Sequence, residues 1–370
     1  MMSYPKVLHT ADWHLGHNRV PTEDTADGIR KYLFPRLAEV DMLLIVGDVF
    51  DGIVDFNDSE ASVILELLAD VMMNCHKHNV ILRIVRGTFS HDRLQMGIID
   101  GLYRKLGIPI NYAQIASMTI EHIDSLDIDI LYVPDNLPYS NKNDVLVEIR
   151  KLLVANNLKT VHYVAIHGEF VHMAFGNDVY NTFSTDDFKD ICSGLLLAGH
   201  IHKPHRKDNL IYAGSFNRLA HNEEEAKGFW IVQGNKASFV ENPESTRLIT
   251  VDYRDESKFD DMLVRHSDLV KIFGTEKVGF LRLIMTDVNL KQAIASYHNA
   301  NYPNIKLTFK TNQKRDVDND RYLREKLTQQ RKEIWEVPSE KNIASIIYNH
   351  LVSTHGVDIS ISIIEELVYV

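Results

Sequence analysis

A short apolar run that ends in a glycine and a carboxylate constrains the fold of this chain more than any other feature. Residues 43–51 read LLIVGDVFD, so the apolar run stops at Gly47 and Asp48. A run of this length closed by a turn residue predicts a strand that is covered on both faces. Gly47 lets the chain turn sharply, and open α/β sheets bind ligands at the carboxyl ends of their strands. The pattern predicts a core strand that delivers Asp48 to a sheet edge, although an ordinary strand before a solvated Asp would look the same.

The same design recurs at four other predicted strands. They cover residues 6–10, 80–85, 161–166 and 195–198, and the polar residues that follow them closely are Asp12, His14, Ser90, His91, Asp92, His167, His200 and His202. Residues two apart in an extended segment point the same way, so Asp12 and His14 can converge on one ion, and His200 and His202 repeat this spacing. One histidine after a strand is usually structural. Five such strand ends together predict a metal site.

Length and composition limit the class of protein. A chain of 370 residues predicts two or three units, and 45% hydrophobic with 25% charged residues is typical of a soluble globular protein. No apolar run approaches the ~20 residues that cross a bilayer, and the N-terminus lacks the pattern of a secretory signal. Cys75 and Cys192 are far apart and show no CxxC spacing, which predicts neither a disulfide framework nor a zinc knuckle. We expect a protein of a reducing cytoplasm, without a membrane span.

The net charge of −11 fits poorly with a nucleic-acid partner, because phosphate binding draws on basic surfaces. Carboxylates that hold divalent cations contribute to such a charge, and local basic groups could still face DNA. These groups are Arg83, Arg86 and Arg93, then Arg104 and Lys105, then Lys203, Arg206 and Lys207. Each of them taken singly reads more simply as a solvated charged face.

The chain divides into three regions by pattern. Helical segments at 24–40, with a kink at Pro35, and from Ser59 alternate with the first strands, which predicts βαβ units, and residues 95–160 look less regular. Asn242 and Pro243 make a plausible linker before an alternation of strand, helix, strand, helix and strand over 247–253, 259–273, 278–285, 290–299 and 305–309. A polar stretch over 314–336 precedes a helix that begins near Ser339 and carries an apolar stripe. This apolar stripe could pack equally well against a partner protein or against the preceding α/β unit of the same chain.

Five motifs resemble those of the calcineurin-like metallophosphoesterases. They are DWH at 12–14, GD at 47–48, HD at 91–92, HG at 167–168 and GHIH at 199–202. Within that superfamily, residues 9–16 and 47–51 resemble the nuclease subunit of the SbcCD type, including its bacteriophage recombination versions. The resemblance implies an α/β (α+β) fold, a sandwich of two mixed sheets flanked by helices. It further implies a metallophosphoesterase domain over 1–240, a capping domain that restricts DNA access over 241–312, and a C-terminal helical segment over 313–370 that docks on a partner ATPase.

The resemblance also implies the ligands of two divalent ions, with Mn²⁺ favoured and Mg²⁺ as the other choice for oxygen and imidazole donors. Asp12, His14, Asp48 and His202 would hold one ion, and Asp48, Ser90, His167 and His200 would hold the other. Asp48 would bridge the two ions, which in such sites lie ~3.5–4 Å apart. His91 would not bind metal; it would position the scissile phosphate and help to protonate the leaving 3′ oxygen, a task that suits imidazole near neutral pH.

The third motif departs from the family pattern. The family has Gly-Asn-His followed by Asp or Glu, whereas this chain reads GTFSHD over 87–92. When His91 and Asp92 are aligned with the family's His-Asp pair, Ser90 takes the Asn position and the loop gains two residues. A hydroxyl is a poorer ligand than an amide carbonyl, so we expect the second ion to bind weakly and the activity to need a high metal concentration.

The function expected from these motifs is that of a two-metal-ion DNA nuclease, an exonuclease and single-strand endonuclease in an SbcCD-like repair and recombination complex. Its expected partners are DNA, an SbcC-type ABC ATPase with a coiled coil, and a second copy of the chain, in a bacterial or phage-infected cytoplasm. A small-molecule or protein phosphoesterase and a weakly catalytic scaffold of the ATPase complex stay open as alternatives. Outside the site, Glu223, Glu224 and Glu225 are expected in a solvated loop.

Overall fold

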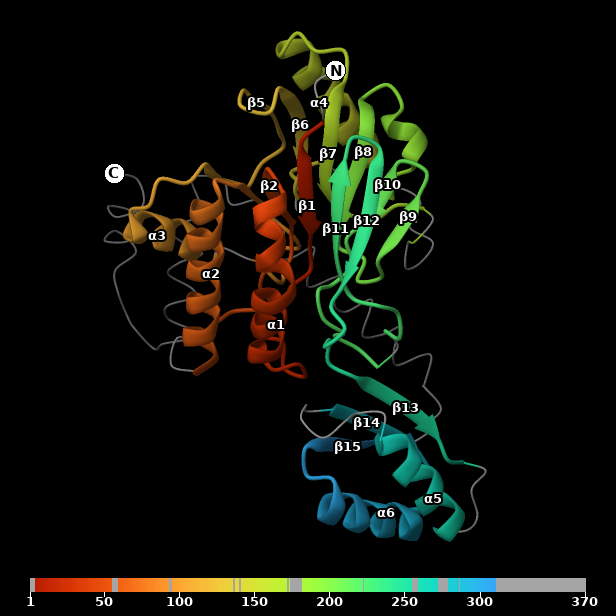
Figure 1. The fold of residues 1–370 in the computed structure, drawn as a ribbon. Helices are drawn as coiled ribbons and strands as arrows, with labels where there is room; N and C mark the ends of the chain where they lie inside the picture. The colour runs from red at the N-terminus through yellow and green to blue at the C-terminus, as the bar shows by residue number, and fades with distance from the viewer. Residues whose placement is uncertain are drawn as a thin grey trace, which may run out of the picture. The chain divides into compact units, whose positions relative to one another are not determined.

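Two six-stranded mixed sheets form the body of the molecule (Figure 1). The computed structural model describes residues 4–54, 59–92, 95–135, 137–139, 141–171, 173, 182–221, 223–254, 259–271, 279–285 and 287–310. The first sheet has the order β12-β11-β1-β2-β3-β4, and the second has the order β5-β6-β7-β8-β10-β9. The predicted α/β sandwich of two mixed sheets flanked by helices is therefore confirmed.

The strands of the first sheet are β1 (Lys6–Thr10), β2 (Met42–Val46), β3 (Ile81–Val85), β4 (Tyr112–Ile115), β11 (Gly228–Gln233) and β12 (Lys236–Glu241). Those of the second are β5 (Thr119–Ile123), β6 (Ile128–Val133), β7 (Val161–His167), β8 (Cys192–Gly199), β9 (His205–Lys207) and β10 (Leu210–Tyr212). Strands β1 to β4 run parallel, as do β6, β7 and β8, so their carboxyl ends meet at one edge of each sheet. This arrangement places the polar residues after the strands together.

The core explains why the central strands read as continuous apolar runs. Leu43 and Ile45 of β2 pack under the helices, whereas Leu44 and Val46 face the second sheet. Every residue of β2 is buried, as the apolar run predicts. Cys75 and Cys192 are both buried free thiols, so the expectation that they form no disulfide is confirmed.

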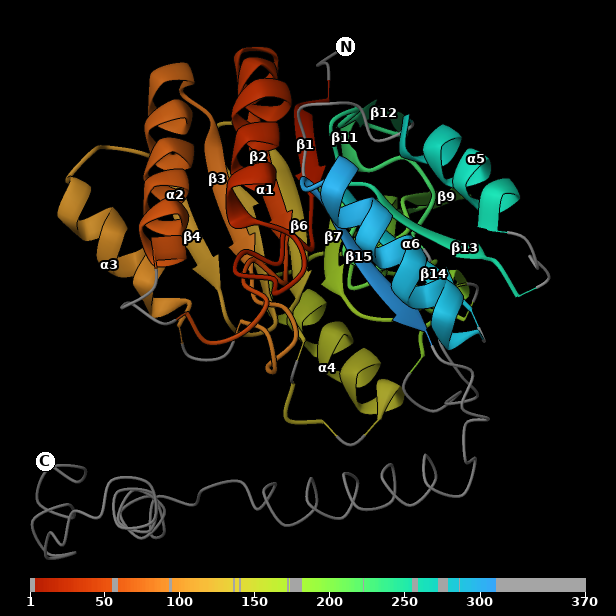
Figure 2. The same ribbon diagram turned by 90° about the horizontal axis from the view of Figure 1, so that it is seen from below.

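The helices that cover the sheets are α1 (Thr22–Gly28), α2 (Ser59–His78), α3 (Gly97–Leu106) and α4 (Lys142–Ala155). Figure 2 shows α1 and α2 side by side along the first sheet. The helix predicted over 24–40 continues from α1 as a π turn, η1 (Ile29–Leu33), and a 3₁₀ turn, η2 (Phe34–Glu39), with Pro35 at the start of the 3₁₀ turn. A short 3₁₀ turn, η3 (Thr185–Phe188), lies before β8.

The middle region between the HD motif and the strand at 161–166, which looks less regular by pattern, consists of regular elements. This region contains α3, β4, β5, β6 and α4. Strands β4 and β5 each lie at the edge of a sheet and are mostly half-buried, because polar residues interrupt their apolar ones. An edge strand has no continuous apolar run, so its pattern resembles a loop.

Residues 248–310 form a small α/β unit with a core of its own. Its elements are β13 (Leu248–Asp252), α5 (Phe259–Val270), β14 (Gly279–Ile284), α6 (Val288–Asn301) and β15 (Ile305–Lys310), in the predicted alternation. The three strands are parallel, and α5 and α6 lie on the same side of them (Figure 1). The domain boundaries at 240/241 and 312/313 stay predictions, and the C-terminal helices expected over 313–370 lie outside the described residues.

The small unit buries a pair of histidines between α5 and α6. His266 and His298 are both fully buried, and their Nε2 and Nδ1 atoms lie 2.9 Å apart. His298 Nε2 donates to the carbonyl of Ile305 at 2.6 Å, so its Nδ1 accepts from His266 Nε2. Nδ1 of His266 is then left buried without a hydrogen-bond partner. Burial and the neighbouring His298 lower the pKa of His266 to about 4.

We expect this pair to destabilise the small unit in mild acid. The unfolded chain takes up a proton on His266 near its ordinary pKa of 6.5, whereas the folded chain does so only near 4, so stability is lost as the pH falls between these values. The loss should reach about 2 kcal/mol after allowance for solvent screening. Hydrogen exchange of the β14 amides at pH 7 and pH 4.5 measures it. His266→Phe should reduce this pH dependence of exchange, whereas the control His122→Ala, at an exposed site, should not. If the pH dependence of exchange in His266→Phe equals that of the wild type, His266 is not its cause.

Candidate metal centre

Strand ends from both sheets bring carboxylates and imidazoles together. Ligand atoms of Asp12, His14 and Asp48 lie within 4.8 Å of one another, and the same holds for Asp48, His167 and His200. Asp48 belongs to both groups, and it is almost completely buried. Asp12, His14 and Asp48 follow β1 and β2 of the first sheet, whereas His167 ends β7 and His200 follows β8 of the second. Two buried groups that share one carboxylate can each hold a metal ion.

His202 lies beside the first group. Its ring centroid is 4.8 Å from that of His14, and the two rings meet edge to face. The structure thus gathers Asp12, His14, Asp48, His167, His200 and His202, all predicted as ligands from the sequence. The resemblance implies four ligands for each of two ions. For each ion, three of these four residues belong to one of the two groups described above.

The backbone is unusual at the residues that present these side chains. Asp12, His14, Asp48 and His200 have φ angles of 51°, 47°, 50° and 89°, in the left-handed region that non-glycine residues rarely adopt. The amides of Asp12 and His14 donate to the carbonyls of Gly47 and Asp48, both at 3.0 Å. The two strand ends therefore hold each other in this conformation, which turns the side chains toward a common point.

Gly47 permits the close approach of the two sheets at this point. A Cβ atom on Gly47 would lie 2.0 Å from Nδ1 of His167. That nitrogen donates to the carbonyl of Val46 at 2.9 Å, which ties β7 to the end of β2. Any larger residue at position 47 would displace the His167 ring.

The imidazoles present the nitrogens that a cation needs. His14 Nδ1 lies 3.0 Å from a carboxylate oxygen of Asp51, and its Nε2 is buried without a hydrogen-bond partner, 3.7 Å from Asp48 Oδ2. His167 Nε2 is 3.4 Å from the same Asp48 oxygen. Metal-bound histidines commonly donate their other N–H to a carboxylate or a carbonyl, as both do here. The unpaired nitrogen of His14 and this donor set fit a divalent cation.

Thr88, and not Ser90, lies between Asp48, His167 and His200. Its hydroxyl is 3.3 Å from Asp48 Oδ2, 3.3 Å from His167 Nε2 and 3.4 Å from His200 Nδ1, and its amide donates to Asp48 Oδ1 at 2.6 Å. Ser90 is exposed in the turn that follows. The geometry favours Thr88 for the ligand position that the alignment of the motif assigned to Ser90.

Both ends of the loop over 87–92 are fixed by hydrogen bonds. This explains where the loop accommodates the two residues that it has in addition to the motif it resembles. Asp92 accepts hydrogen bonds from the amides of Asp48, Phe50 and Gly87, at 3.1, 3.2 and 2.7 Å. Gly87 and Thr88 are held at the start of the loop and Asp92 at its end, so the additional pair of residues forms the exposed turn between them. Sequence alignment from the His91 end alone cannot locate this turn.

The pKa values of Asp48 and His167 shift because the two groups form a buried ion pair. Burial alone would raise the pKa of Asp48, but His167, His14 and His91 hold it well below its usual range. Burial alone would lower the pKa of His167, but its contact with Asp48 raises it to about 10. A divalent ion held by Asp48 and His167 would compete with this proton on His167, so its binding would release protons.

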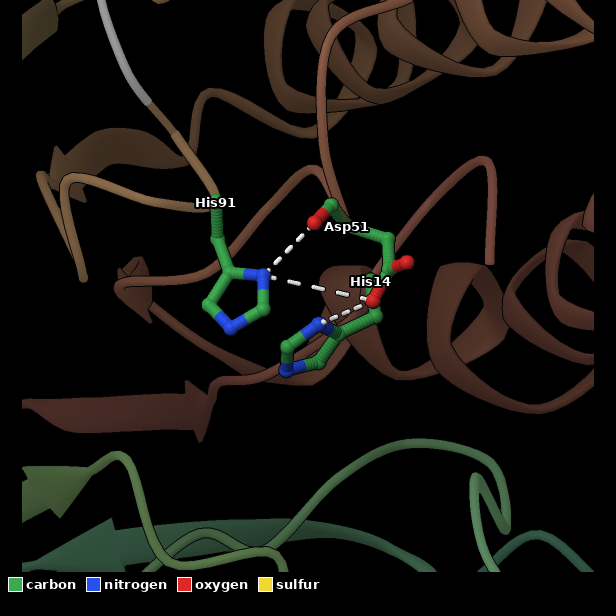
Figure 3. Close-up of side chains that lie close together, drawn as sticks. All are labelled: His14, Asp51 and His91. Carbon is green, nitrogen blue, oxygen red and sulfur yellow. Dashed lines mark hydrogen bonds and ion pairs between the residues drawn. The ribbon is translucent and has the colours of Figure 1, made fainter. Parts of the chain in front are cut away.

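Asp51 joins the metal-facing His14 to His91 (Figure 3). Its carboxylate accepts from His14, and its backbone carbonyl accepts from His91 Nδ1 at 2.6 Å. Because a carbonyl oxygen only accepts, His91 carries its proton on Nδ1 and leaves Nε2 as the other ring nitrogen. The His91 ring lies edge to face with His14, 4.6 Å between centroids, and its side chain is 32% exposed. His91 thus borders the ligand groups and faces solvent.

The expectation that Glu223 lies in a solvated loop was wrong. Glu223 is only 7% exposed, and its Oε1 atom lies 3.0 Å from Nδ1 of His202. Lys227, its partner, is fully buried. Neither residue belongs to a recognisable motif, and Glu223 is held by the amide of Leu219 as well as by Lys227. Of the three acidic residues, only Glu224 is exposed, so a run of charges was not enough to indicate a solvated segment.

Comparisons with known proteins leave the family undecided. No protein-family model and no curated protein matches the chain. A solved structure with 15% sequence identity aligns over 65% of this chain and 99% of its own, with a TM-score of 0.40, and its printed name states no activity. A likeness of that size carries no argument. Across the described residues, none of the helices has the length and apolar character required to span a bilayer.

The placement of Thr88 leads to a test of the second ligand group. We expect Thr88→Asn to tighten Mn²⁺ binding at one site about tenfold, because an amide oxygen coordinates better than a hydroxyl. Manganese titration followed by electron paramagnetic resonance measures both sites. Ser90→Asn is the matched control and should leave both affinities unchanged. Tighter binding in Ser90→Asn alone would instead favour the ligand predicted from the motif.

Proposed function

We propose that this chain is a two-metal-ion nuclease that hydrolyses DNA phosphodiesters. The observation that carries the proposal is the shared Asp48, buried between one ligand group with Asp12 and His14 and another with His167 and His200. Together with His202 and Thr88, these residues would hold two divalent ions, for which Mn²⁺ is the best match to oxygen and imidazole donors. Two such ions supply an activated water near neutral pH and stabilise the attacking and leaving oxygens.

The chain's own residues supply proton transfer and orientation. His91 stands next to His14 with Nδ1–H fixed on the Asp51 carbonyl, so its free nitrogen, Nε2, once it has taken up a proton, can give that proton to the leaving 3′ oxygen. Asp51 keeps His91 and His14 in register with each other. The left-handed backbone at Asp12 and Asp48 fixes the carboxylates before any substrate binds, which limits reorganisation during the reaction.

The small α/β unit offers a basic surface that suits DNA. Residues that alternate with the core positions of β13, β14 and β15 face away from α5 and α6, and they include Arg282, Lys306 and Lys310. Arg282 is half-buried and both lysines are exposed. The acidic residue at this face, Asp252, is paired with Arg254. A local basic face supplies the phosphate contacts that the net charge of the chain does not.

This face yields a prediction on affinity. We expect the triple variant Arg282→Gln, Lys306→Gln, Lys310→Gln to weaken DNA binding and to reduce the slope of log K against log salt by about 0.9 for each phosphate that the variant no longer neutralises. Binding to labelled duplex at several salt concentrations measures this. Hydrolysis of bis(p-nitrophenyl) phosphate, which is too small to reach the face, should not change. An unchanged slope would mean that DNA takes another path.

The larger assembly is a further part of the proposal. The resemblance supports a subunit of an SbcCD-like repair and recombination complex, with an SbcC-type ATPase and a second copy of this chain as partners. The segment that would dock on the ATPase, residues 313–370, lies outside the described residues. A small-molecule or protein phosphoesterase is the second candidate, because the same ligand groups would serve any phosphate ester.

Substrate comparison separates these candidates. The full-length chain with Mn²⁺ should cleave duplex or single-stranded DNA, and the rate should exceed that on cyclic nucleotides and phosphopeptides at equal concentration. The Asp48→Asn variant, prepared in parallel, is the negative control, and any DNA cleavage in that preparation measures contaminating nuclease. Preference for a cyclic nucleotide or a phosphopeptide would favour the second candidate, and Mn²⁺ binding without hydrolysis of any of these esters would favour a scaffold.

A further inference from the structure

Lys227 is a buried charge that the proposed reaction does not use. Its side chain is completely buried, and Nζ has three acceptors: the carbonyl of His202 at 2.7 Å, Glu223 Oε2 at 2.7 Å and Glu225 Oε1 at 3.0 Å. An ammonium group has three donors, so each of them is matched. A buried lysine is costly unless it is paired in this way, and a fully satisfied one fixes its surroundings.

The sheet register explains how Lys227 reaches the metal centre. Strand β11 pairs antiparallel with β1, and His9 lies opposite Trp230. When this register is extended by three residues beyond His9 and Trp230, Lys227 lies opposite Asp12. The antiparallel pairing therefore starts β11 at the edge where β1 ends.

Glu223 connects Lys227 to His202 through its two carboxylate oxygens. Oε2 faces Lys227 and also accepts from the amide of Leu219 at 3.0 Å. Oε1 lies 3.0 Å from Nδ1 of His202. A carboxylate accepts, so the proton sits on Nδ1 of His202, and Nε2 keeps a lone pair for a cation. Lys227 additionally holds the backbone of His202 through its carbonyl, together with the amide of Ser215 at 3.0 Å.

We propose that Lys227 and Glu223 are positioning residues that hold His202 in the tautomer and orientation required by the ion of the Asp12 and His14 group. The inference rests on the proposed metal-dependent function and adds to it the residues that select how His202 binds. Carboxylate partners of metal-bound histidines typically contribute 10–100-fold in metal affinity, by fixing the ring and its proton. The other ion would be held by Asp48, His167 and His200, which are not among the residues bonded to Glu223 and Lys227 in the described part of the chain.

Metal titration with full-length protein tests the inference. We expect Glu223→Ala and Lys227→Met to weaken one of two Mn²⁺ sites by about 10–100-fold and to leave the other within about threefold, as measured by electron paramagnetic resonance. Arg83→Met is the matched control, since Arg83 is also a buried cation paired with a glutamate, Glu121, away from the metal centre. It should leave both sites unchanged. Circular dichroism on each variant shows that it is folded.

A second measurement does not need metal. In the metal-free wild type at alkaline pH, long-range ¹⁵N–¹H spectra should show the His202 proton on Nδ1, and in Glu223→Ala a mixture of both tautomers. The double variant Glu223→Gln, Lys227→Met keeps an acceptor for His202 and removes both buried charges. It should show the Nδ1 tautomer, and it serves as the test if a single variant fails to fold.

The outcomes separate the inference from the proposed function. If the wild type binds two ions and the Glu223 and Lys227 variants match it in affinity and tautomer, the inference is wrong and the proposed function stands. If the wild type binds no divalent ion, the proposed function fails, whereas the tautomer spectra still decide whether Glu223 sets the proton of His202. Equal weakening of both sites would also overturn the inference, because it would indicate a general loss of structure.

Discussion

The Asp48→Asn variant should lose at least about a thousandfold in kcat for DNA cleavage, about 4 kcal/mol of transition-state stabilisation. Asp48 is the carboxylate common to both ligand groups, so its neutralisation would remove the anion that the proposal places between two cations. Asparagine tolerates the φ of 50° at this position, so the backbone should be preserved. Mn²⁺ titration should show that both metal sites are lost, and not only one of them.

The control for this variant is Asp129→Asn. Asp129 also contacts two histidines, His122 and His162, but on β6, outside the ligand groups. Its replacement should leave kcat and metal stoichiometry unchanged. If Asp48→Asn retains both ions, the two ligand groups do not share a bridging carboxylate, and the two-metal proposal has to be abandoned.

His91→Ala should reduce kcat by about 10²–10⁴-fold and leave Mn²⁺ affinity within about threefold, because general-acid catalysis contributes that much and the proposal gives His91 a proton-transfer role outside the two ligand groups. The defect should depend on the leaving group. A substrate with a 3′-bridging sulfur leaves without protonation, so the variant should cleave it nearly as fast as the wild type does.

His122→Ala is the control for this prediction, because His122 is paired with aspartates at an exposed site on β5. It should behave as the wild type with both substrates. An equal defect on the normal and the sulfur-bridged substrate would show that His91 acts by positioning, without donating a proton. Unchanged cleavage of DNA by His91→Ala would assign the activity to another site or to a contaminant.

The sequence was sufficient for the parts of this molecule that local pattern determines. The run before Gly47 predicted β2, and the apolar segments at 161–166 and 195–198 predicted β7 and β8, because central strands are covered on both faces. Parallel strands end at one edge of a sheet, which groups Asp12 with Asp48 in the first sheet and His167 with His200 in the second. That all four residues form one site was implied by the resemblance and not by local pattern.

Local pattern failed where a residue's role depends on contacts made by distant segments. Nothing near Thr88 in sequence distinguishes it from Ser90, and only the fixing of Asp92 by three backbone amides decides which of them faces Asp48. Glu223 looked like one of three solvated acids, although it is buried between His202, Lys227 and the amide of Leu219. The edge strands β4 and β5 were missed because half-buried strands alternate with polar residues.

The division of the ligands between the two sheets has a consequence for biosynthesis. A ribosome that makes this chain releases Asp12 and Asp48 early, His167, His200 and His202 only after more than a hundred further residues, and Lys227 last of all. No partial product contains both halves of the cation-binding set until the second sheet has been made. If the proposed hydrolysis of phosphodiesters requires both ligand groups, a nascent chain that ends before His200 should be inactive.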